Sequence, residues 1–369
     1  MPKTTNANMQ IIQEGLFEHL YVFWMFVLFK NSNFINQVWR FILMEVIIPM
    51  GGIGKRMRPH TFSKPKPLIH VAGKPMLGHI LDRIQAVKPS KVHLIISDFE
   101  DTVKTFLKDY AFKFNIKKQQ QLLGDGFAIY QVKEDVKEDC LIIFSDTIFD
   151  ADLSVIKEAR RKKENIIWIK EVADSRRFGV VTVKNGYVTG MVEKPEKPVS
   201  NLAIVGMYYL YDSSLLFSSL QEAMKNNMQS KGEYRLIDAL ALLLKKGEKI
   251  TTQSLKAWMD CGTIETLLET NKVLLKKHSK KIKTENSVII DPVFIEDGAV
   301  IKNSVIGPFV SIAADTKVEN SLINNSIIDE ASEIVNAQIK DSVIGRDATV
   351  EGAFKTLNVG DASEIINKS

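Results

Sequence analysis

The chain has 369 residues, of which 45% are hydrophobic and 25% are charged, and its net charge is +5. This length allows two domains with a substantial core, and the composition is that of an ordinary globular protein. The mild basicity indicates a lysine-rich surface and no nucleic-acid partner, because no run interleaves arginine with aromatic residues. Cys140 and Cys261 have no His or Cys neighbours at metal spacing. This argues against a disulfide scaffold or a structural zinc site and predicts a cytoplasmic protein.

Residues 1–43 form an N-terminal extension whose role the sequence leaves open. Residues 20–29 read LYVFWMFVLF, an apolar run too short to span a bilayer. No signal peptide is indicated, because Lys3 is the lone early cation and no small-residue cleavage site follows. Two interpretations remain: a peripheral membrane anchor, or a mis-called start upstream of a natural start at Met44, which we favour. We expect no stable membrane insertion in either case.

Residues 44–280 alternate between predicted strands and predicted helices. The strands are expected at residues 45–49, 91–97 and 140–144, and the helices at residues 76–86, 101–110 and 153–163. This alternation predicts an α/β fold with a Rossmann-like, mainly parallel sheet and helices on both faces. Sites in such sheets form at the carboxyl ends of strands, where Gly51 and Asp146 both fall.

The pattern changes after Lys283, where aliphatic residues recur about every six positions. These positions are Ile289, Ile295, Ile301, Ile306, Ile312, Val318, Leu322, Ile328, Ile334, Ile339, Ile344 and Val350. A six-residue period fits neither a helix nor an alternating strand, and it predicts a parallel β-helix over residues 285–352, followed by a tail at 353–369. The repeats resemble the hexapeptide family of left-handed β-helices. We expect this part to cap the fold or to mediate self-association into a homo-oligomer.

The densest chemical signal follows the first predicted strand, where residues 51–68 read GGIGKRMRPHTFSKPKPL and residues 73–76 read GKPM. The backbone N–H groups of Gly51, Gly52 and Gly54 can lie against a polyphosphate where a side chain would clash. Arg56 and Lys66 add positive charge, which suits the negative charge that develops at an attacked phosphorus. The loop is not a P-loop, because no Gly-Lys-Ser/Thr closes it at the required spacing.

These motifs resemble the signature of the sugar-1-phosphate nucleotidyltransferases, also called nucleotide-sugar pyrophosphorylases: G-G-x-G-x-R-L-x-P-x-T, then P-K-P-L and G-K-P-M. The resemblance runs from residue 44 to about residue 276, and the repeats extend it to about residue 352. It implies an enzyme that joins a nucleoside triphosphate to a sugar-1-phosphate and releases pyrophosphate. Arg56 is then implied to stabilise the transition state, and Lys66 to hold triphosphate oxygens.

The resemblance also implies the residues that read the base and hold the metal. Residues 121–128 read QLLGDGFA, which makes Gln121 and Gly126 nucleotide-binding residues, with Gln119 and Gln120 as competing registers for the glutamine. Asp146, after the third predicted strand, and Asp260, in the run WMDCGT at residues 258–263, are implied to hold Mg²⁺. Mg²⁺ suits such a site because it prefers a few carboxylates together with phosphate oxygens and water.

The sugar-phosphate half of the site is implied by later motifs. Glu193 would accept hydrogen bonds from sugar hydroxyls, Lys194 would pair with the sugar phosphate, and Gly179 and Asn201 would complete the pocket. The resemblance favours dTTP or UTP as the nucleotide and glucose-1-phosphate as the sugar, and a guanylyltransferase acting on mannose-1-phosphate is an alternative.

Two functions other than nucleotidyl transfer are compatible with parts of the sequence. A non-catalytic regulatory or scaffolding homologue is an alternative because Met57, His60 and Ser145 depart from the family pattern. An acyltransferase site in the β-helix is disfavoured, because no histidine follows His278.

Overall fold

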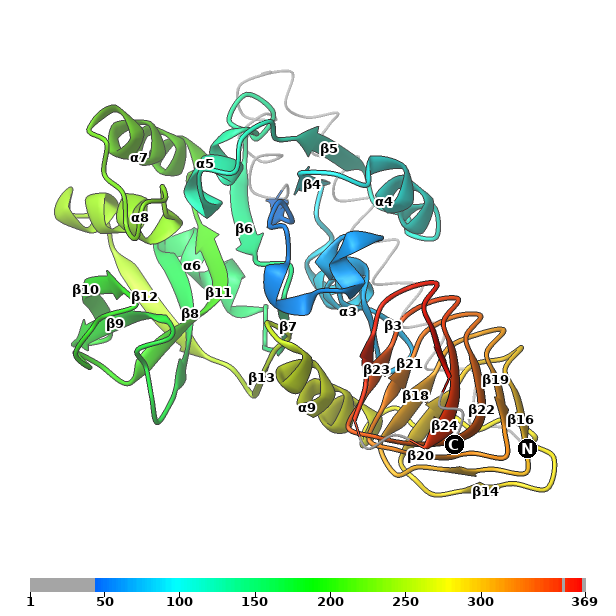
Figure 1. The fold of residues 1–369 in the computed structure, drawn as a ribbon. Helices are drawn as coiled ribbons and strands as arrows, with labels where there is room; N and C mark the ends of the chain where they lie inside the picture. Colours follow the sequence, from blue (N-terminus) through cyan, green and yellow to red (C-terminus); the bar gives the residue numbers. More distant parts are fainter. Residues whose placement is uncertain (1–43, 354–355, 367–369) are drawn as a thin grey trace, which may run out of the picture. The chain divides into compact units, whose positions relative to one another are not determined.

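A nine-stranded sheet forms the centre of the α/β part (Figure 1). The computed structural model describes residues 44–353 and 356–366, so the N-terminal extension, including the apolar run at residues 20–29, lies outside the described residues. In sheet order the strands are β5 (Phe114–Lys118), β4 (Lys91–Ile96), β1 (Met44–Pro49), β6 (Asp139–Ile143), β11 (Leu202–Leu210), β8 (Asn165–Glu171), β12 (Ile250–Ser254), β10 (Tyr187–Glu193) and β9 (Gly179–Lys184).

The strands near the expected site run parallel, and the far half of the sheet is mixed. β1 is parallel to β4 and β6, β4 is parallel to β5, and β8 is parallel to β12. β11 runs antiparallel to both β6 and β8, and β10 runs antiparallel to β12 and β9. The expected α/β sheet is therefore present, with an antiparallel strand joining its two parallel groups.

Helices cover both faces of the sheet, as its continuously apolar strands predict. They are α3 (Met76–Ile84), α4 (Glu100–Leu107), α5 (Asp125–Tyr130), α6 (Val155–Lys162), α7 (Ser213–Lys225) and α8 (Leu236–Lys245). In β1, Val46 and Ile48 enter the core under α3, α4 and α6, whereas Ile47 enters the core under α5, α7 and α8. This alternation follows from the two-residue period of a strand.

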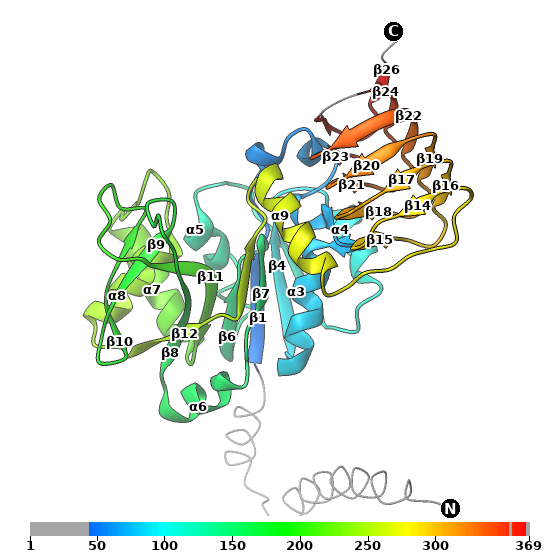
Figure 2. The same cartoon turned by 90° about the horizontal axis from the view of Figure 1, so that it is seen from below.

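Short elements connect the sheet to the C-terminal part. They are β2 (His70–Val71), β3 (Lys74–Pro75), β7 (Thr147–Asp150), β13 (Ala257–Asp260) and α9 (Ile264–Leu275). Figure 2 shows α9 running alongside the β-helix. The described residues from Met44 onward belong to one compact unit. Within the described residues, no helix has the length and hydropathy that crossing a bilayer requires.

The C-terminal strands stack in parallel as a β-helix. They are β14 (Val288–Ile289), β15 (Val293–Ile295), β16 (Val300–Lys302), β17 (Val305–Ile306), β18 (Val310–Ile312), β19 (Lys317–Glu319), β20 (Leu322–Asn324), β21 (Ile327–Ile328), β22 (Glu333–Lys340), β23 (Val343–Ile344), β24 (Thr349–Ala353), β25 (Asn358–Val359) and β26 (Glu364–Ile366). β25 and β26 pair with β23 and β24, so residues in the expected tail contribute further strands of the stack.

The recurring Asn-Ser fragments have a structural explanation. Asn303 and Asn320 adopt left-handed backbone conformations, with φ of 48° and 49°, which asparagine tolerates better than most residues. The next residue of each fragment links successive coils, because the Ser321 N–H donates to Ser304 Oγ at 3.0 Å. The predicted set of inward-facing aliphatic residues in the β-helix was wrong at one position. Leu322 is 44% exposed and Ile323 is fully buried, because adjacent residues of a strand point to opposite sides.

Candidate active site

The glycine loop and Asp146 leave the sheet at the same edge. β1 and β6 are parallel neighbours, with Val46 paired with Leu141, so the chain after Pro49 and the chain after Ile143 continue side by side. This is the arrangement that the carboxyl ends of parallel strands predict.

A small two-stranded sheet brings Asp260 to this edge of the large sheet. β13 pairs antiparallel with β7 and places Asp260 opposite Thr147, the residue that follows Asp146. The Cys261 N–H donates to the carbonyl of Asp146 at 3.1 Å. Thr263 then caps α9 and fixes the chain directly after the carboxylate. The two aspartates are thus held together by backbone pairing, although they are far apart in sequence.

The charges around the two aspartates shift their pKa values in opposite directions. Burial favours the neutral form of Asp146, but Lys66, whose Nζ lies 2.7 Å from Asp146 Oδ2, and the more distant Arg56 outweigh it, so the pKa of Asp146 is lowered. Burial and the charge of Asp146 raise the pKa of Asp260, against the opposing effect of Lys66, Arg56 and Arg177. Two neighbouring carboxylates with Lys66, Arg56 and Arg177 close by are typical of a site that binds a metal cation and phosphates.

Two cavities meet at Asp146. The first has a volume of about 350 Å³ and is lined by the glycine loop, including Gly52, Gly54 and Lys66. The second has a volume of about 310 Å³ and is lined by Asp260 and Trp258 together with the chain around Gly179 and Glu193. The residues that line both cavities are Arg56, Asp125, Phe144, Asp146 and Arg235. The arrangement can therefore hold two ligands whose reacting ends meet beside Asp146.

Two glycines of the loop have separate requirements. Gly54 has a φ of 58°, and a Cβ there would lie 2.7 Å from Thr61 Cγ2, so the turn needs glycine. A Cβ on Gly51 would collide with the side-chain amide of Gln119. The structure therefore places Gln119 against the glycine loop.

The competing glutamines of the predicted base-reading run have different surroundings. Gln121, the predicted residue, is exposed, whereas Gln119 is buried and its Oε1 has no hydrogen-bond partner among the described residues. Gln119 directly follows β5, and its N–H donates to Ile96 O at 2.8 Å, which continues the pairing with β4 and turns it inward. Gly126 is buried, but its N–H donates to Tyr234 O at 2.9 Å, so it packs against the start of α8. None of Gln119, Gln121 and Gly126 lines the two cavities, and Gln119 alone of the three contacts the glycine loop, at Gly51.

Three of the four predicted sugar-phosphate residues line the second cavity: Gly179, Glu193 and Lys194. A Cβ on Gly179 would lie 2.9 Å from Glu193 Oε2, so the glycine makes room for this carboxylate. Lys194 Nζ lies 3.3 Å from Glu193 Oε1. Asn201 does not line the cavity, because it precedes β11 and donates from Nδ2 to Glu171 Oε1 at 2.5 Å.

The structure adds charged residues that the motifs did not single out. Arg177 lines the second cavity, next to the predicted Gly179. Asp125 and Arg235 line both cavities and form an ion pair of 2.9 Å, and Arg235 also pairs with Glu233 at 2.8 Å. Asp125 stands between Gly124 and Gly126 in the predicted base-reading run, so its position in that run was the available signal.

The residues at the site fit Mg²⁺ as the resident cation. Within residues 44–353 and 356–366, no group of three or more His, Cys, Asp or Glu side chains could hold a metal ion. Asp146 and Asp260 offer only carboxylate oxygens, the hard ligands that Mg²⁺ prefers, and too few of them to complete its shell. Mg²⁺ tolerates such incomplete protein coordination when phosphate and water oxygens supply the remainder.

Comparison with known proteins identifies the family and the fold. The family model described as nucleotidyl transferase matches residues 45–277. The chain is 32% identical over 328 residues to the bifunctional protein GlmU of Methanocaldococcus jannaschii, covering 82% of this chain and 78% of that protein. It is 28% identical over 341 residues to glucose-1-phosphate thymidylyltransferase of Streptomyces griseus, covering 84% and 94%. A UDP-glucose pyrophosphorylase complexed with UDP-glucose shares the fold, with a TM-score of 0.57 and 24% identity over 64% of this chain and 99% of that one.

Proposed function

The chain belongs to the nucleotidyl transferase family, among the sugar-1-phosphate nucleotidyltransferases, and from that premise we propose that it transfers a nucleotidyl group from dTTP or UTP to glucose-1-phosphate. One observation carries the proposal: Arg56 and Asp146 line both cavities, one bounded by the glycine loop and one by Glu193 and Lys194. A triphosphate in the first and a sugar phosphate in the second would react at their junction.

The residues of the first cavity would bind and orient the triphosphate. The N–H groups of the glycine loop face its oxygens, and Arg56 and Lys66 stabilise the charge that builds up at the α-phosphorus. Asp146 and Asp260 would hold Mg²⁺, which neutralises phosphate charge when bound.

The second cavity would hold the attacking group. Glu193 would accept hydrogen bonds from sugar hydroxyls, while Lys194 and Arg177 pair with the sugar phosphate. A phosphate oxygen attacks the α-phosphorus in line, the bond to pyrophosphate breaks, and pyrophosphate leaves. The phosphate monoester is already ionised at neutral pH, so no general base is needed, and positioning and charge stabilisation account for the rate.

Two observations support dTTP or UTP and glucose-1-phosphate as the substrates. The relative from Streptomyces griseus is named for thymidylyl transfer to glucose-1-phosphate and aligns with 84% of this chain. Gln119, buried beside Gly51, is the candidate for reading the edge of a pyrimidine base. A guanylyltransferase acting on mannose-1-phosphate is the alternative. It would require the side-chain amide of Gln119 to hydrogen-bond to a purine base.

The test is pyrophosphate release by the full chain across a grid of dTTP, UTP, GTP, ATP and CTP against several sugar-1-phosphates, with Mg²⁺. We expect the highest kcat/KM for dTTP or UTP with glucose-1-phosphate, and a nucleotide-sugar as the second product. Highest turnover of GTP with mannose-1-phosphate would establish the alternative. No pyrophosphate from any pair would refute the enzymatic assignment and favour a scaffolding homologue.

A further inference from the structure

The loop that carries Arg56 and Lys66 has little regular structure of its own. Between β1 and β2 it forms three short 3₁₀ turns, at Lys55–Met57, His60–Phe62 and Lys66–Leu68. The backbone hydrogen bonds of these turns are local, such as the Met57 N–H to Gly54 O at 2.8 Å. Short 3₁₀ turns are weakly stable, so contacts with the rest of the fold must fix the position of this loop.

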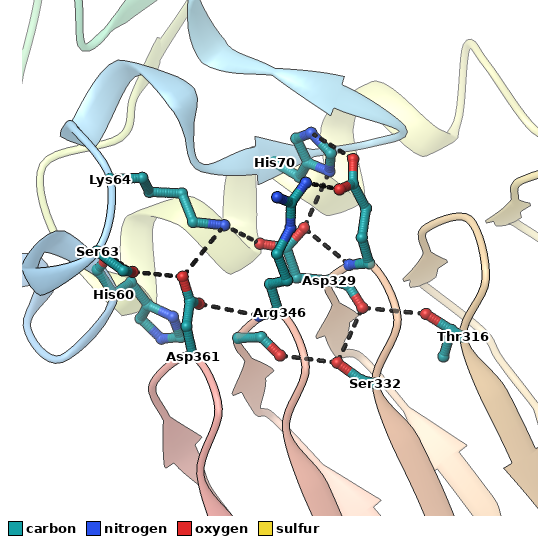
Figure 3. Close-up of polar contacts among 11 residues, drawn as sticks. His60, Ser63, Lys64, His70, Thr316, Asp329, Ser332, Arg346 and Asp361 are labelled. Atoms are coloured by element: carbon teal, nitrogen blue, oxygen red, sulfur yellow. Dashed lines mark hydrogen bonds and ion pairs between the residues drawn. The ribbon is translucent and has the colours of Figure 1, made fainter. Parts of the chain in front are cut away.

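The β-helix supplies several of these contacts, and Figure 3 shows those of Asp329 and Asp361. His60, Ser63 and Lys64, which make contacts of this kind, lie between Arg56 and Lys66 in sequence. His60 Nε2 lies 2.7 Å from Asn358 Oδ1. The Ser63 hydroxyl donates to a carboxylate oxygen of Asp361. Lys64 Nζ lies 2.5 Å from Asp329 Oδ2 and 3.7 Å from Asp361 Oδ2. The outer side of the loop is thus held by three residues of the β-helix.

The partners in the β-helix are themselves fixed. Asp329 is buried, and its carbonyl accepts from the hydroxyls of Thr316 and Ser332, at 3.0 and 2.9 Å. Its other carboxylate oxygen lies 3.2 Å from His70 Nδ1, at the far end of the loop. Asp361 Oδ1 accepts from the Arg346 N–H at 2.9 Å. The loop therefore rests on two aspartates that hydrogen bonds within the β-helix hold in place.

Apolar packing joins the same partners. Met57, which directly follows Arg56, is fully buried in a cluster that contains Ile327 of β21 and Val343 of β23. At Gly360, a Cβ would come within 2.9 Å of Pro59 Cβ, which shows how closely the loop approaches this coil. A shift of the β-helix would move Met57, and with it the neighbouring Arg56.

The segment that carries Asp260 contacts the β-helix as well. Asn271, on α9, is fully buried and accepts from the Ala72 N–H at 2.9 Å and from the Ser311 hydroxyl at 2.6 Å. Its Nδ2 donates to Phe309 O at 3.2 Å. One side chain thus joins the end of the loop, α9 and the β-helix.

We propose that the β-helix is a positioning element for the nucleotidyl transfer: Asp329, Asn358 and Asp361 hold the loop at residues 55–71 so that Arg56 and Lys66 face the triphosphate. The inference rests on the proposed function. His60, Ser63, Lys64 and His70 are positioning residues, because they act through the loop and line neither cavity. A β-helix that served only self-association would not need to contact the chain between Arg56 and Lys66.

The kinetic test compares Lys64→Ala, Asp329→Asn and the double variant with the wild type, in the full chain with saturating Mg²⁺. Lys302→Ala is the matched control, because Lys302 also pairs with a carboxylate, Glu285 at 3.2 Å, but on an exposed face of the β-helix. We expect kcat to fall by ~10- to 100-fold in the single variants, the size of effect that a small misplacement of reacting groups produces. The KM for the sugar phosphate should stay within ~2-fold, since Glu193 and Lys194 lie outside the loop. The double variant should lose less than the product of the two single losses, because both single variants remove the Lys64–Asp329 ion pair.

A second pair of variants keeps the test decisive if Lys64→Ala does not fold. Lys64→Arg retains the charge and should keep at least half of the wild-type kcat, and Ser63→Ala removes only one hydroxyl. We expect Ser63→Ala to lower kcat by ~3-fold, on the scale of a single lost hydrogen bond. An unchanged kcat in Ser63→Ala and Asp329→Asn, with an active wild type, would overturn the proposal.

Hydrogen exchange separates this inference from the proposed function. Peptides covering residues 55–71 should exchange at least ~5-fold faster in Lys64→Ala or Ser63→Ala than in Lys302→Ala, with no substrate present, because local opening is easier without these contacts. Equal exchange in all variants would refute the positioning role even if the enzyme is active. If these peptides exchange faster in the variants but the wild type releases no pyrophosphate, the proposed function is refuted. The result would still show that the β-helix holds the loop in place.

Discussion

The two faces of the loop at residues 55–71 use charge in different ways. On the face towards the β-helix, Lys64 forms an ion pair with Asp329, so positive and negative charges are matched within the fold. On the face towards the cavities, Lys66 pairs with Asp146 at 2.7 Å, but Arg56 makes no ion pair among the described residues, and the charge of Asp146 raises the pKa of Asp260. Charge that is matched internally holds structure in place, whereas unmatched charge at a cavity is available for a ligand. Substitutions on the two faces should therefore have different signatures.

The largest effect is expected on the cavity face. Arg56→Ala and Asp260→Ala should each lower kcat by at least ~100-fold, because each removes charge complementary to the transition state. The unfolding temperature of Arg56→Ala should change little, and that of Asp260→Ala should equal or exceed the wild-type value, since the substitution relieves the repulsion from Asp146. Steady-state pyrophosphate release and a thermal scan measure both quantities. Rates like those of the wild type in both variants would contradict the assignment of this cavity.

A smaller and more selective effect is expected in the second cavity. Lys194→Ala should raise the KM for the sugar-1-phosphate by ~10-fold or more, the scale of a lost charged hydrogen bond, and should leave the KM for the nucleotide within ~2-fold. Asn201→Ala is the matched control, because Asn201 bonds to Glu171 outside the cavity. Equal changes in both variants would show that the cavity is not the sugar-phosphate site.

The glutamine register predicts a contrast between two neighbouring residues. Gln119→Ala should raise the KM for the nucleotide by ~3- to 10-fold, since one neutral hydrogen bond to a base is lost. Gln121→Ala should be indistinguishable from the wild type, because its side chain is exposed. Nucleotide-dependent kinetics on both variants would settle the register, and the reverse pattern would restore Gln121.

The smallest effect is a pH dependence of stability on the β-helix face. Burial raises the pKa of Asp329, but His70 and Lys64 outweigh it and hold the pKa well below its usual range. A carboxyl with a lowered pKa in the folded state stabilises the protein above its unfolded pKa of about 3.9, and this contribution is lost as the pH falls further. Asp329→Asn should therefore lower the unfolding temperature most at neutral pH, and the difference should shrink below about pH 4. A constant difference from pH 7 to pH 3 would show that the ion pairs contribute nothing.

The sequence predicted the parts of the fold that depend on local pattern. Continuous apolar runs located β1, β4 and β6, and the carboxyl ends of these strands located Gly51 and Asp146. The antiparallel direction of β11 was not predicted, because an apolar run is equally suited to either direction. Leu322 was misplaced because a six-residue period does not specify which of two adjacent aliphatic residues points inward.

The site was only partly readable, for a related reason. The convergence of Asp260 on Asp146 came from the family resemblance, since the pairing of β13 with β7 has no local signal. The contacts of Ser63 with Asp361 and of Lys64 with Asp329 join residues 298 and 265 positions apart, and nothing in the loop sequence indicates them. Contacts between residues so far apart in sequence are identified only in the folded structure.

The central claim is that the glycine loop, the turn after β6 and the end of β13 enclose one bound triphosphate. Hydrogen exchange of the wild-type chain, with and without dTTP or UTP and Mg²⁺, tests this directly and needs no turnover. We expect peptides covering residues 50–68, 144–148 and 258–263 to become protected together, at the same nucleotide concentration. Protection of the glycine loop alone, with the segments around Asp146 and Asp260 unchanged at saturating nucleotide, would contradict a shared site.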